Sequence, residues 1–207
     1  MFSSTKTVTS TSSFSERKEW LSEQIAEADY VLIGAGAGLT TAAGIDYAGE
    51  DFRREFREWI ARYGITDLYS AGVYPFKTDE ERWAMWAKHI WFSRYRTGAL
   101  PLYKKLLKMV DGKDYFVITT NVDHQFQRAG FDKKRLFYTQ GDYGLFQPLG
   151  GKDDRTWDNE EWVMDAMEAQ GFVKDENGIF QMPADGNVSM RIPSDLIPAD
   201  PVTGGPV

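Results

Sequence analysis

Three polar side chains with hydrogen-bonding chemistry follow two short apolar runs of the sequence. Asn121 and Asp123 come directly after the run at 115–120, and Gln140 follows the run at 136–138. In an open α/β sheet, polar residues at the carboxyl ends of the strands face the ligand crevice, so these amide and carboxylate groups are candidates for holding a ligand. Alternatively, Asn121 and Asp123 only cap a helix expected over 123–129. Both interpretations stay open at this point.

A glycine-rich segment precedes these residues and points to phosphate chemistry. Residues 31–45 read VLIGAGAGLTTAAGI, an apolar strand that runs into a turn containing Gly34, Gly36 and Gly38. Glycines let backbone N–H groups approach a pyrophosphate, and the N-terminus of the helix that follows carries partial positive charge. The same pattern also occurs where a helix merely packs close to a sheet, so a purely structural turn is the alternative.

Composition limits the classes of protein to which the chain can belong. The 207 residues are 42% hydrophobic and 14% aromatic, which is enough for a packed core. The net charge of −7 argues against a nucleic-acid partner, because phosphate backbones require a basic face. No apolar run reaches the roughly 20 residues of a membrane helix. With no cysteine in the chain, disulfides are excluded, and a cytoplasmic location is the default expectation.

Strands that alternate with helices predict an α/β fold with a parallel sheet. A disordered tail is expected over 1–15, an α/β domain over 16–146 with a helical insertion at about 50–97, and a small domain over 147–207. The insertion contains an aromatic stripe and a tryptophan-rich helix, which we interpret as buried. Helices are predicted at 14–28, 50–63, 78–95, 101–110 and 159–170, strands at 30–33, 115–120 and 136–138, and a hairpin at 172–182.

Four motifs, in order and at matching spacing, resemble those of the sirtuins. Residues 34–45 are similar to the family's cofactor loop, residues 119–123 to its Thr-Gln-Asn-x-Asp, residues 128–130 to the Ala-Gly that follows, and residues 139–141 to its x-His-Gly. Gln140 and the stretch 141–147 resemble the microbial class M sirtuins, which transfer ADP-ribose to lipoylated carrier proteins. The resemblance implies an incomplete Rossmann-like parallel sheet of sirtuin type and a small zinc-ribbon-like module.

The resemblance also implies a role for each matching residue toward NAD. The cofactor loop contributes Gly34, Ala35, Gly36, Gly38 and Gly44, with the first three cradling the phosphates. Tyr47 stands near the family's mobile phenylalanine, but residues 46–48 lack the arginine expected there. Asn121 would hold the nicotinamide ribose, and Asp123 the carboxamide. Gln140 occupies the position of the catalytic histidine, so the expected catalytic set is Asn121, Asp123 and Gln140.

The glutamine at position 140 favours group transfer over deacylation. Sirtuin deacylation needs a base that takes a proton from a ribose hydroxyl, and a glutamine amide does not take up protons near neutral pH. Transfer of ADP-ribose to an acceptor protein does not need that proton to move. Neither histidine is expected to replace the base: we expect His124 to lie on a helix and point away from Gln140, and His89 to be a core or helix-surface residue.

Two departures from the family weaken the assignment. Pro148, Asp200 and Thr203 stand where zinc-binding cysteines are expected, so no metal is predicted, and packing after residue 146 must rely on aromatic and aliphatic side chains. The sheet strands that follow the zinc module in the family are missing, so a second copy or another partner is expected to complete the sheet. The alternatives are an NAD-dependent deacylase and a non-catalytic nucleotide-binding module. A dehydrogenase fits worst, because the acidic residues after the glycine turn fall on a helix rather than at a strand end.

Overall fold

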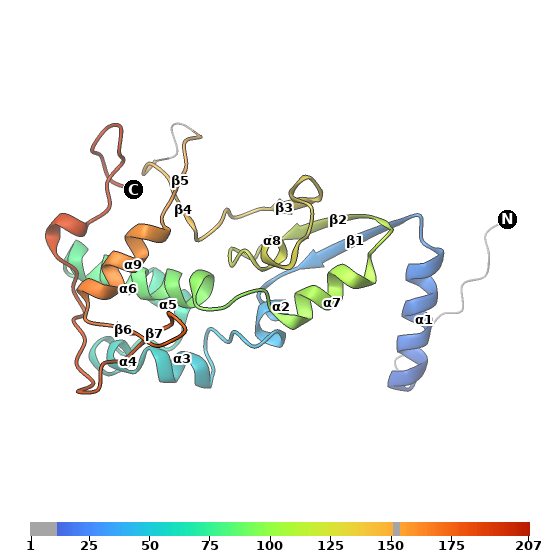
Figure 1. The fold of residues 1–207 in the computed structure, drawn as a ribbon, viewed down its shortest axis with the longest axis horizontal. Coiled ribbons are helices and arrows are strands. Elements are labelled where there is room, and N and C mark those ends of the chain that lie inside the picture. The colour runs from blue at the N-terminus through green and yellow to red at the C-terminus, as the bar shows by residue number, and fades with distance from the viewer. Residues whose placement is uncertain (1–11, 151–153) are drawn as a thin grey trace.

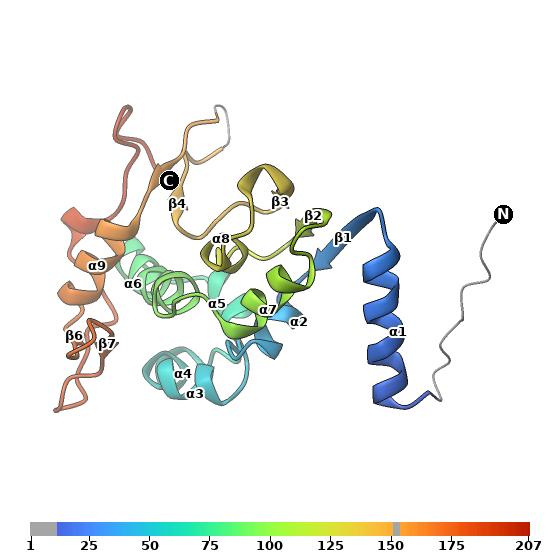
Figure 2. The same cartoon turned by 45° about the vertical axis from the view of Figure 1, so that its right-hand side comes forward.

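The computed structural model describes residues 12–150 and 154–207. The tail predicted over 1–15 lies, as far as residue 11, outside the described residues. Helix α1 (Phe14–Glu27) already begins at Phe14, because Ser13 and Glu16 form a capping box at its start. In both ribbon views α1 stands apart from the rest of the molecule, and none of its residues is buried (Figures 1 and 2).

Three parallel strands form the sheet that the alternating pattern predicts. They are β1 (Tyr30–Ala35), β2 (Asp114–Thr119) and β3 (Leu136–Tyr138), in the order β1-β2-β3. The predicted α/β fold with a parallel sheet is therefore confirmed. Their carboxyl ends point toward the group of helices that includes α5 and α6 (Figure 1), so the predicted site residues gather between the sheet and those helices.

The two faces of this sheet have different surroundings. Helices α2 (Ala37–Ala42), α7 (Pro101–Met109) and α8 (Gln125–Ala129) pack on one face around Val117. We call these strands and helices the sheet layer. On the other face, apolar side chains that alternate along the strands remain exposed; they are Tyr30, Leu32, Phe116, Ile118 and Phe137. A parallel sheet ordinarily has both faces covered, so the exposed face is unusual.

A second group of helices forms what we call the helical module. It comprises α3 (Glu50–Glu55), α4 (Arg57–Tyr63), α5 (Leu68–Gly72), α6 (Asp79–Ile90), the π-helix η1 (Trp91–Tyr95), α9 (Glu160–Ala169) and the segments that pack on them. The prediction of a single helix over 50–63 is wrong, because the structure has two helices, α3 and α4, in this range. The chain breaks at Phe56, whose φ of −116° and ψ of 20° are not helical. The helix predicted over 78–95 likewise changes to π geometry at Trp91.

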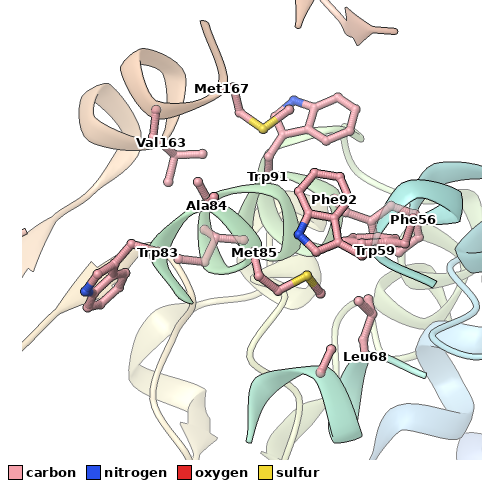
Figure 3. Close-up of a cluster of buried hydrophobic side chains, with 14 of the residues drawn as sticks. Phe56, Trp59, Leu68, Trp83, Ala84, Met85, Trp91, Phe92, Val163 and Met167 are labelled. Carbon is pink, nitrogen blue, oxygen red and sulfur yellow. The ribbon is translucent and has the colours of Figure 1, made fainter. Parts of the chain in front are cut away.

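Aromatic packing holds the helical module together. Figure 3 shows Phe56, Trp59 and Phe92 side by side, with Met167 of α9 next to Trp91. Residues before 97 and after 146 share this one hydrophobic cluster. The expectation that the later segment depends on apolar packing is confirmed, since Phe172 and Phe180 are buried in the cluster and Trp157, Trp162 and Ile179 pack against it.

Short strand pairs and an ion pair organise the residues after β3. Strand β4 (Leu145–Phe146) pairs with β5 (Trp157–Asp158), β6 (Val173–Lys174) pairs with β7 (Phe180–Gln181), and a 3-10 turn, η3, spans Ser194–Leu196. Asp200 accepts hydrogen bonds from the Arg155 guanidinium at 3.0 and 2.9 Å, and from the Thr203 hydroxyl at 2.7 Å. A polar contact thus joins Asp200 and Thr203, two of the positions at which the resemblance implies zinc-binding cysteines.

Within residues 12–150 and 154–207, no group of three or more histidine, aspartate or glutamate side chains is arranged to hold a metal ion. No helix in the same ranges has both the length and the apolar character needed to cross a bilayer.

Candidate active site

The glycine segment joins β1 to α2 at the carboxyl edge of the sheet. Strand β1 is longer than the predicted 30–33 and includes Gly34 and Ala35, which pair with Ile118 and Thr119 of β2. Gly36 is the N-cap of α2, and Gly38 lies within that helix. The predicted loop is therefore a strand end that continues directly into a short helix.

Space above this segment suits a ligand that approaches the backbone. A Cβ on Gly34 or on Gly38 would meet no atom within 4 Å, whereas one on Gly36 would lie 3.3 Å from the Thr120 hydroxyl. Gly44, at φ +110°, adopts a conformation that side chains other than glycine rarely adopt. The segment fits a pyrophosphate as the resemblance implies, because the backbone at Gly34 and Gly38 is open.

Asp123 is the centre of a buried hydrogen-bond network at the strand ends. It is 1% exposed and accepts a hydrogen bond of 2.6 Å from the Thr40 hydroxyl of α2. The Tyr103 hydroxyl of α7 lies 3.0 Å from the Thr40 hydroxyl and donates to Asp123 at 3.4 Å. Asn121 donates from Nδ2 to the same Tyr103 hydroxyl at 3.2 Å. One network thus joins the glycine segment, α7 and the loop after β2.

Asp123 also bonds to the start of helix α8, in line with the capping alternative. Its second oxygen accepts a hydrogen bond of 3.0 Å from the backbone N–H of Gln125, the first residue of α8. Asn121 does not cap this helix with its side chain; it is half-buried, and no partner for its Oδ1 is found in the described part of the chain. Asn121 is therefore the one of the two with a hydrogen-bonding atom still available to a ligand.

Burial controls ionisation around Asp123. Burial raises the pKa of Asp123, while the hydrogen bonds from Thr40 and the Gln125 backbone oppose that rise. Burial together with the charge of Asp123 raises the pKa of Tyr103 to about 12. Tyr143, on the loop after β3, has its pKa raised to about 12 by burial, by Tyr69 and by Asp123. Both tyrosines therefore keep their protons at neutral pH and can act as hydrogen-bond donors.

Tyr47 belongs to the same region. It packs edge-on against Tyr69, with ring centroids 5.7 Å apart and planes at 83°. The pKa of Tyr47 is raised by burial and then by the charge of Asp123, so its hydroxyl lies within electrostatic range of the network. This places the one aromatic residue predicted to shield a ribose on the side of Asp123.

Gln140 lies on the loop that follows β3. Its side chain is exposed and makes no hydrogen bond within the described residues. Two backbone hydrogen bonds of 2.9 Å tie this loop to the one after β2, from Thr139 N–H to the Thr119 carbonyl and from Tyr143 N–H to the Val122 carbonyl. The loops that carry Asn121, Asp123 and Gln140 are therefore neighbours, as the sequence predicts.

Sequence reasoning missed several residues of this region. Tyr103 lies on a helix outside every motif, and Thr40 falls within the glycine-rich segment without being singled out; only the folded chain brings the two to Asp123. His124 does not lie on the helix as expected; it is the N-cap of α8, with a left-handed backbone, and its ring contacts Asp142 on the loop of Gln140. His89 is 3% exposed, stacked on Trp86 in the core.

Comparison with solved structures identifies the class of fold to which the chain belongs. No protein-family model matches the chain. A solved structure described as a Sir2 homologue in complex with NAD matches this chain at 19% sequence identity and a TM-score of 0.51. The match covers 86% of this chain and 64% of the chain in that structure. The chain therefore has a sirtuin-type fold, built on a three-stranded parallel sheet in the part that the structure describes.

Curated sequences narrow the resemblance within that class. A Staphylococcus aureus protein named protein ADP-ribosyltransferase is 32% identical over 155 residues, which is 75% of this chain and 49% of that protein. A Fusarium oxysporum protein named probable bifunctional ADP-ribose hydrolase/ADP-ribosyltransferase is 36% identical over 160 residues, 75% of this chain and 26% of that protein. The chain is thus similar to the ADP-ribosyltransferase-like sirtuins, and it spans half or less of the length of these curated relatives.

Proposed function

We propose that the chain is an NAD-dependent protein ADP-ribosyltransferase of sirtuin type. It would transfer ADP-ribose from NAD to an acceptor protein and release nicotinamide. The observation that carries the proposal is the joined pair of strand-end loops, in which Asn121 keeps an amide oxygen available while an amide, Gln140, stands in place of the family's base. The names of both curated relatives support the same activity.

Each residue has a proposed part in binding NAD, which is consumed as a substrate. Gly34, Ala35, Gly36, Gly38 and Gly44 would admit the phosphates to the backbone. Tyr47 would shield the nicotinamide ribose, which Asn121 would hold. Asp123 was expected to bind the carboxamide, yet both of its oxygens accept hydrogen bonds within the protein; we therefore propose that it positions the site through Thr40 and Gln125 as well.

The resemblance to class M sirtuins extends the proposal to the partner. We propose a lipoylated carrier protein of the glycine-cleavage type as the acceptor, the cytoplasm as the compartment, and a second copy of the chain as a candidate to complete the sheet. A non-catalytic nucleotide-binding module is the second candidate function, and two features of the sequence favour it: the lack of cysteines at the expected zinc-ligand positions and the lack of an arginine at residues 46–48.

Replacing Asn121 by alanine tests the activity. We expect Asn121→Ala to reduce nicotinamide release and labelling of a lipoylated carrier by about a hundredfold or more, the effect typical of losing one positioned hydrogen-bonding group. Tyr103 keeps its contact with Thr40 in this variant, so folding should be preserved. Asn177→Ala, in the exposed β6–β7 hairpin, is the matched control.

Calorimetry with NAD separates the two candidate functions. Binding with turnover that depends on Asn121 supports the transferase. Binding by a wild-type chain that releases no nicotinamide supports the non-catalytic module instead, and equal rates for wild type and Asn121→Ala contradict the role given to this residue.

A further inference from the structure

His124 has a backbone conformation that the chain adopts nowhere else among its described non-glycine residues. Its φ is +62° and its ψ is 14°, in the left-handed region. This region disfavours residues with a Cβ by roughly 1–2 kcal/mol. Such strain persists where surrounding contacts over-determine the residue, and it clusters at functional sites. The contacts of the imidazole identify what holds it there.

Asp142 holds the ring of His124. The Nδ1 atom of His124 is hydrogen-bonded to one carboxylate oxygen of Asp142. The other oxygen accepts hydrogen bonds from Arg94 Nε at 2.9 Å and from the Gly144 backbone N–H at 2.8 Å. A Cβ at position 144 would come within 2.9 Å of Arg94 Nε, so any larger residue there would require the Arg94 side chain to shift. The carboxylate of Asp142 is therefore fixed from three sides.

The charge on Asp142 determines which imidazole nitrogen carries a proton. Burial alone would raise the pKa of Asp142, but the hydrogen bonds from His124 and Gly144 and the charge of Arg94 bring it below its ordinary value. An ionised carboxylate accepts the proton of Nδ1, which leaves the lone pair of a neutral imidazole on Nε2. This Nε2 has no hydrogen-bond partner in the described part of the chain, and the side chain is 31% exposed.

The pair lies beside the candidate active site. His124 directly follows Asp123, and Asp142 stands two residues after Gln140. The 2.9 Å hydrogen bond from Tyr143 N–H to the Val122 carbonyl joins the two loops between these positions. The imidazole Nε2 of His124, a basic nitrogen, thus lies at the edge of the candidate site. In that site a glutamine, Gln140, occupies the position at which the family has its catalytic base.

We infer that His124 is the general base that activates the acceptor, with Asp142 as its positioning residue; this inference rests on the proposed transferase function. The nucleophilic atom of the acceptor attacks C1′ of the nicotinamide ribose. The bond from C1′ to the nicotinamide nitrogen breaks, and nicotinamide leaves with that electron pair. The proton of the acceptor's nucleophile passes to Nε2 of His124, and the carboxylate of Asp142 stabilises the resulting imidazolium.

Chemical rescue tests this role, with a lipoylated carrier as the acceptor. His124→Gly suits the positive φ and removes the base, so we expect labelling to fall about a hundredfold while NAD binding and the melting temperature stay unchanged. Added imidazole should restore part of the rate in this variant. His124→Asn, which tolerates the same backbone and can donate to Asp142, should stay slow because its amide accepts no proton.

Two results would overturn the inference. One is labelling by His124→Gly at the wild-type rate; the other is a slow rate that imidazole leaves unchanged, because a purely structural role predicts both low activity and no rescue. Failure of the proposed function gives a different result, since the wild-type chain would then release no nicotinamide from NAD. That outcome removes the inference together with the function on which it rests.

Discussion

The helical module and the sheet layer bury their apolar side chains in different ways. In the module, rings from helices before residue 97 pack against side chains after residue 146, and Trp59, Phe56 and Phe92 are fully buried (Figure 3). In the sheet layer only one face is covered, and large apolar side chains stay exposed on the other. Stability is therefore concentrated in the module, whereas the groups suited to chemistry gather at the strand ends of the sheet layer.

The helical module and the sheet layer also differ in how their polar and charged side chains are used. Lys88 of α6 is buried between the rings of Trp91 and Phe172, with its Nζ 4.4 Å from each ring centroid, and forms an ion pair of 3.2 Å with Glu55. Burial lowers the pKa of Lys88 to about 8, against the opposing charge of Glu55. In the sheet layer, by contrast, the polar atoms of Asn121 and His124 retain capacity for a ligand. The module uses charged groups in its packing, whereas the sheet layer keeps uncharged polar atoms available.

The largest expected effect comes from the core of the module. We expect Trp59→Ala to lower the free energy of unfolding by about 3–5 kcal/mol, because the indole is 0% exposed and packs on Phe56 and Phe172. Chemical denaturation monitored by circular dichroism measures this. A loss below about 1 kcal/mol would show that the module is not the main source of stability.

A buried histidine gives the module a specific sensitivity to acid. Burial lowers the pKa of His89 to about 3 from an ordinary value of 6.5. Between these values the unfolded chain binds more protons than the folded chain, so stability is lost as the pH falls below 6.5. By about pH 5 the loss amounts to about 2 kcal/mol.

The variant His89→Phe isolates this contribution. A phenyl ring can keep the stacking on Trp86, whose centroid lies 5.1 Å from that of His89, but does not titrate. We expect the unfolding free energy of this variant to fall less steeply than that of wild type between pH 7 and about pH 5. Identical slopes for the two proteins would assign the acid sensitivity to other groups.

The smallest effect is expected on the open face of the sheet. Leu32 is 68% exposed, so Leu32→Ser should change the free energy of unfolding by no more than about 0.5 kcal/mol. Light scattering at high concentration should fall, because exposed apolar patches promote association. A large loss of stability would instead mean that this face is covered in solution, and the comparison between the two regions would need revision.

The sequence was sufficient where local patterns control structure. Short apolar runs bounded by turns predicted the three parallel strands, and the helix predicted from residue 78 begins there, with Thr78 as the N-cap of α6. Aromatic spacing predicted the buried faces of the helices that form the module. The division into domains near residue 146 stays a prediction, although side chains from both sides of that boundary share one hydrophobic cluster.

Contacts between distant segments could not be predicted in the same way. The break of the predicted helix at Phe56 and the π-helical turn at Trp91 have no local breaker such as proline or glycine. For His124, helical periodicity predicted a side chain that points away from Gln140. The left-handed backbone directs it to Asp142 instead.

The sequence by itself determined the α/β class, the parallel strands and the strand-end positions of Asn121, Asp123 and Gln140, because hydrophobic periodicity and turn chemistry act over a few residues. Only the tertiary structure decided that Thr40 and Tyr103 enclose Asp123 and that Arg94 and Gly144 fix the partner of His124. Apart from the local bond between Gly144 and Asp142, those hydrogen bonds join residues far apart in the chain, and their geometry depends on how whole helices and loops pack.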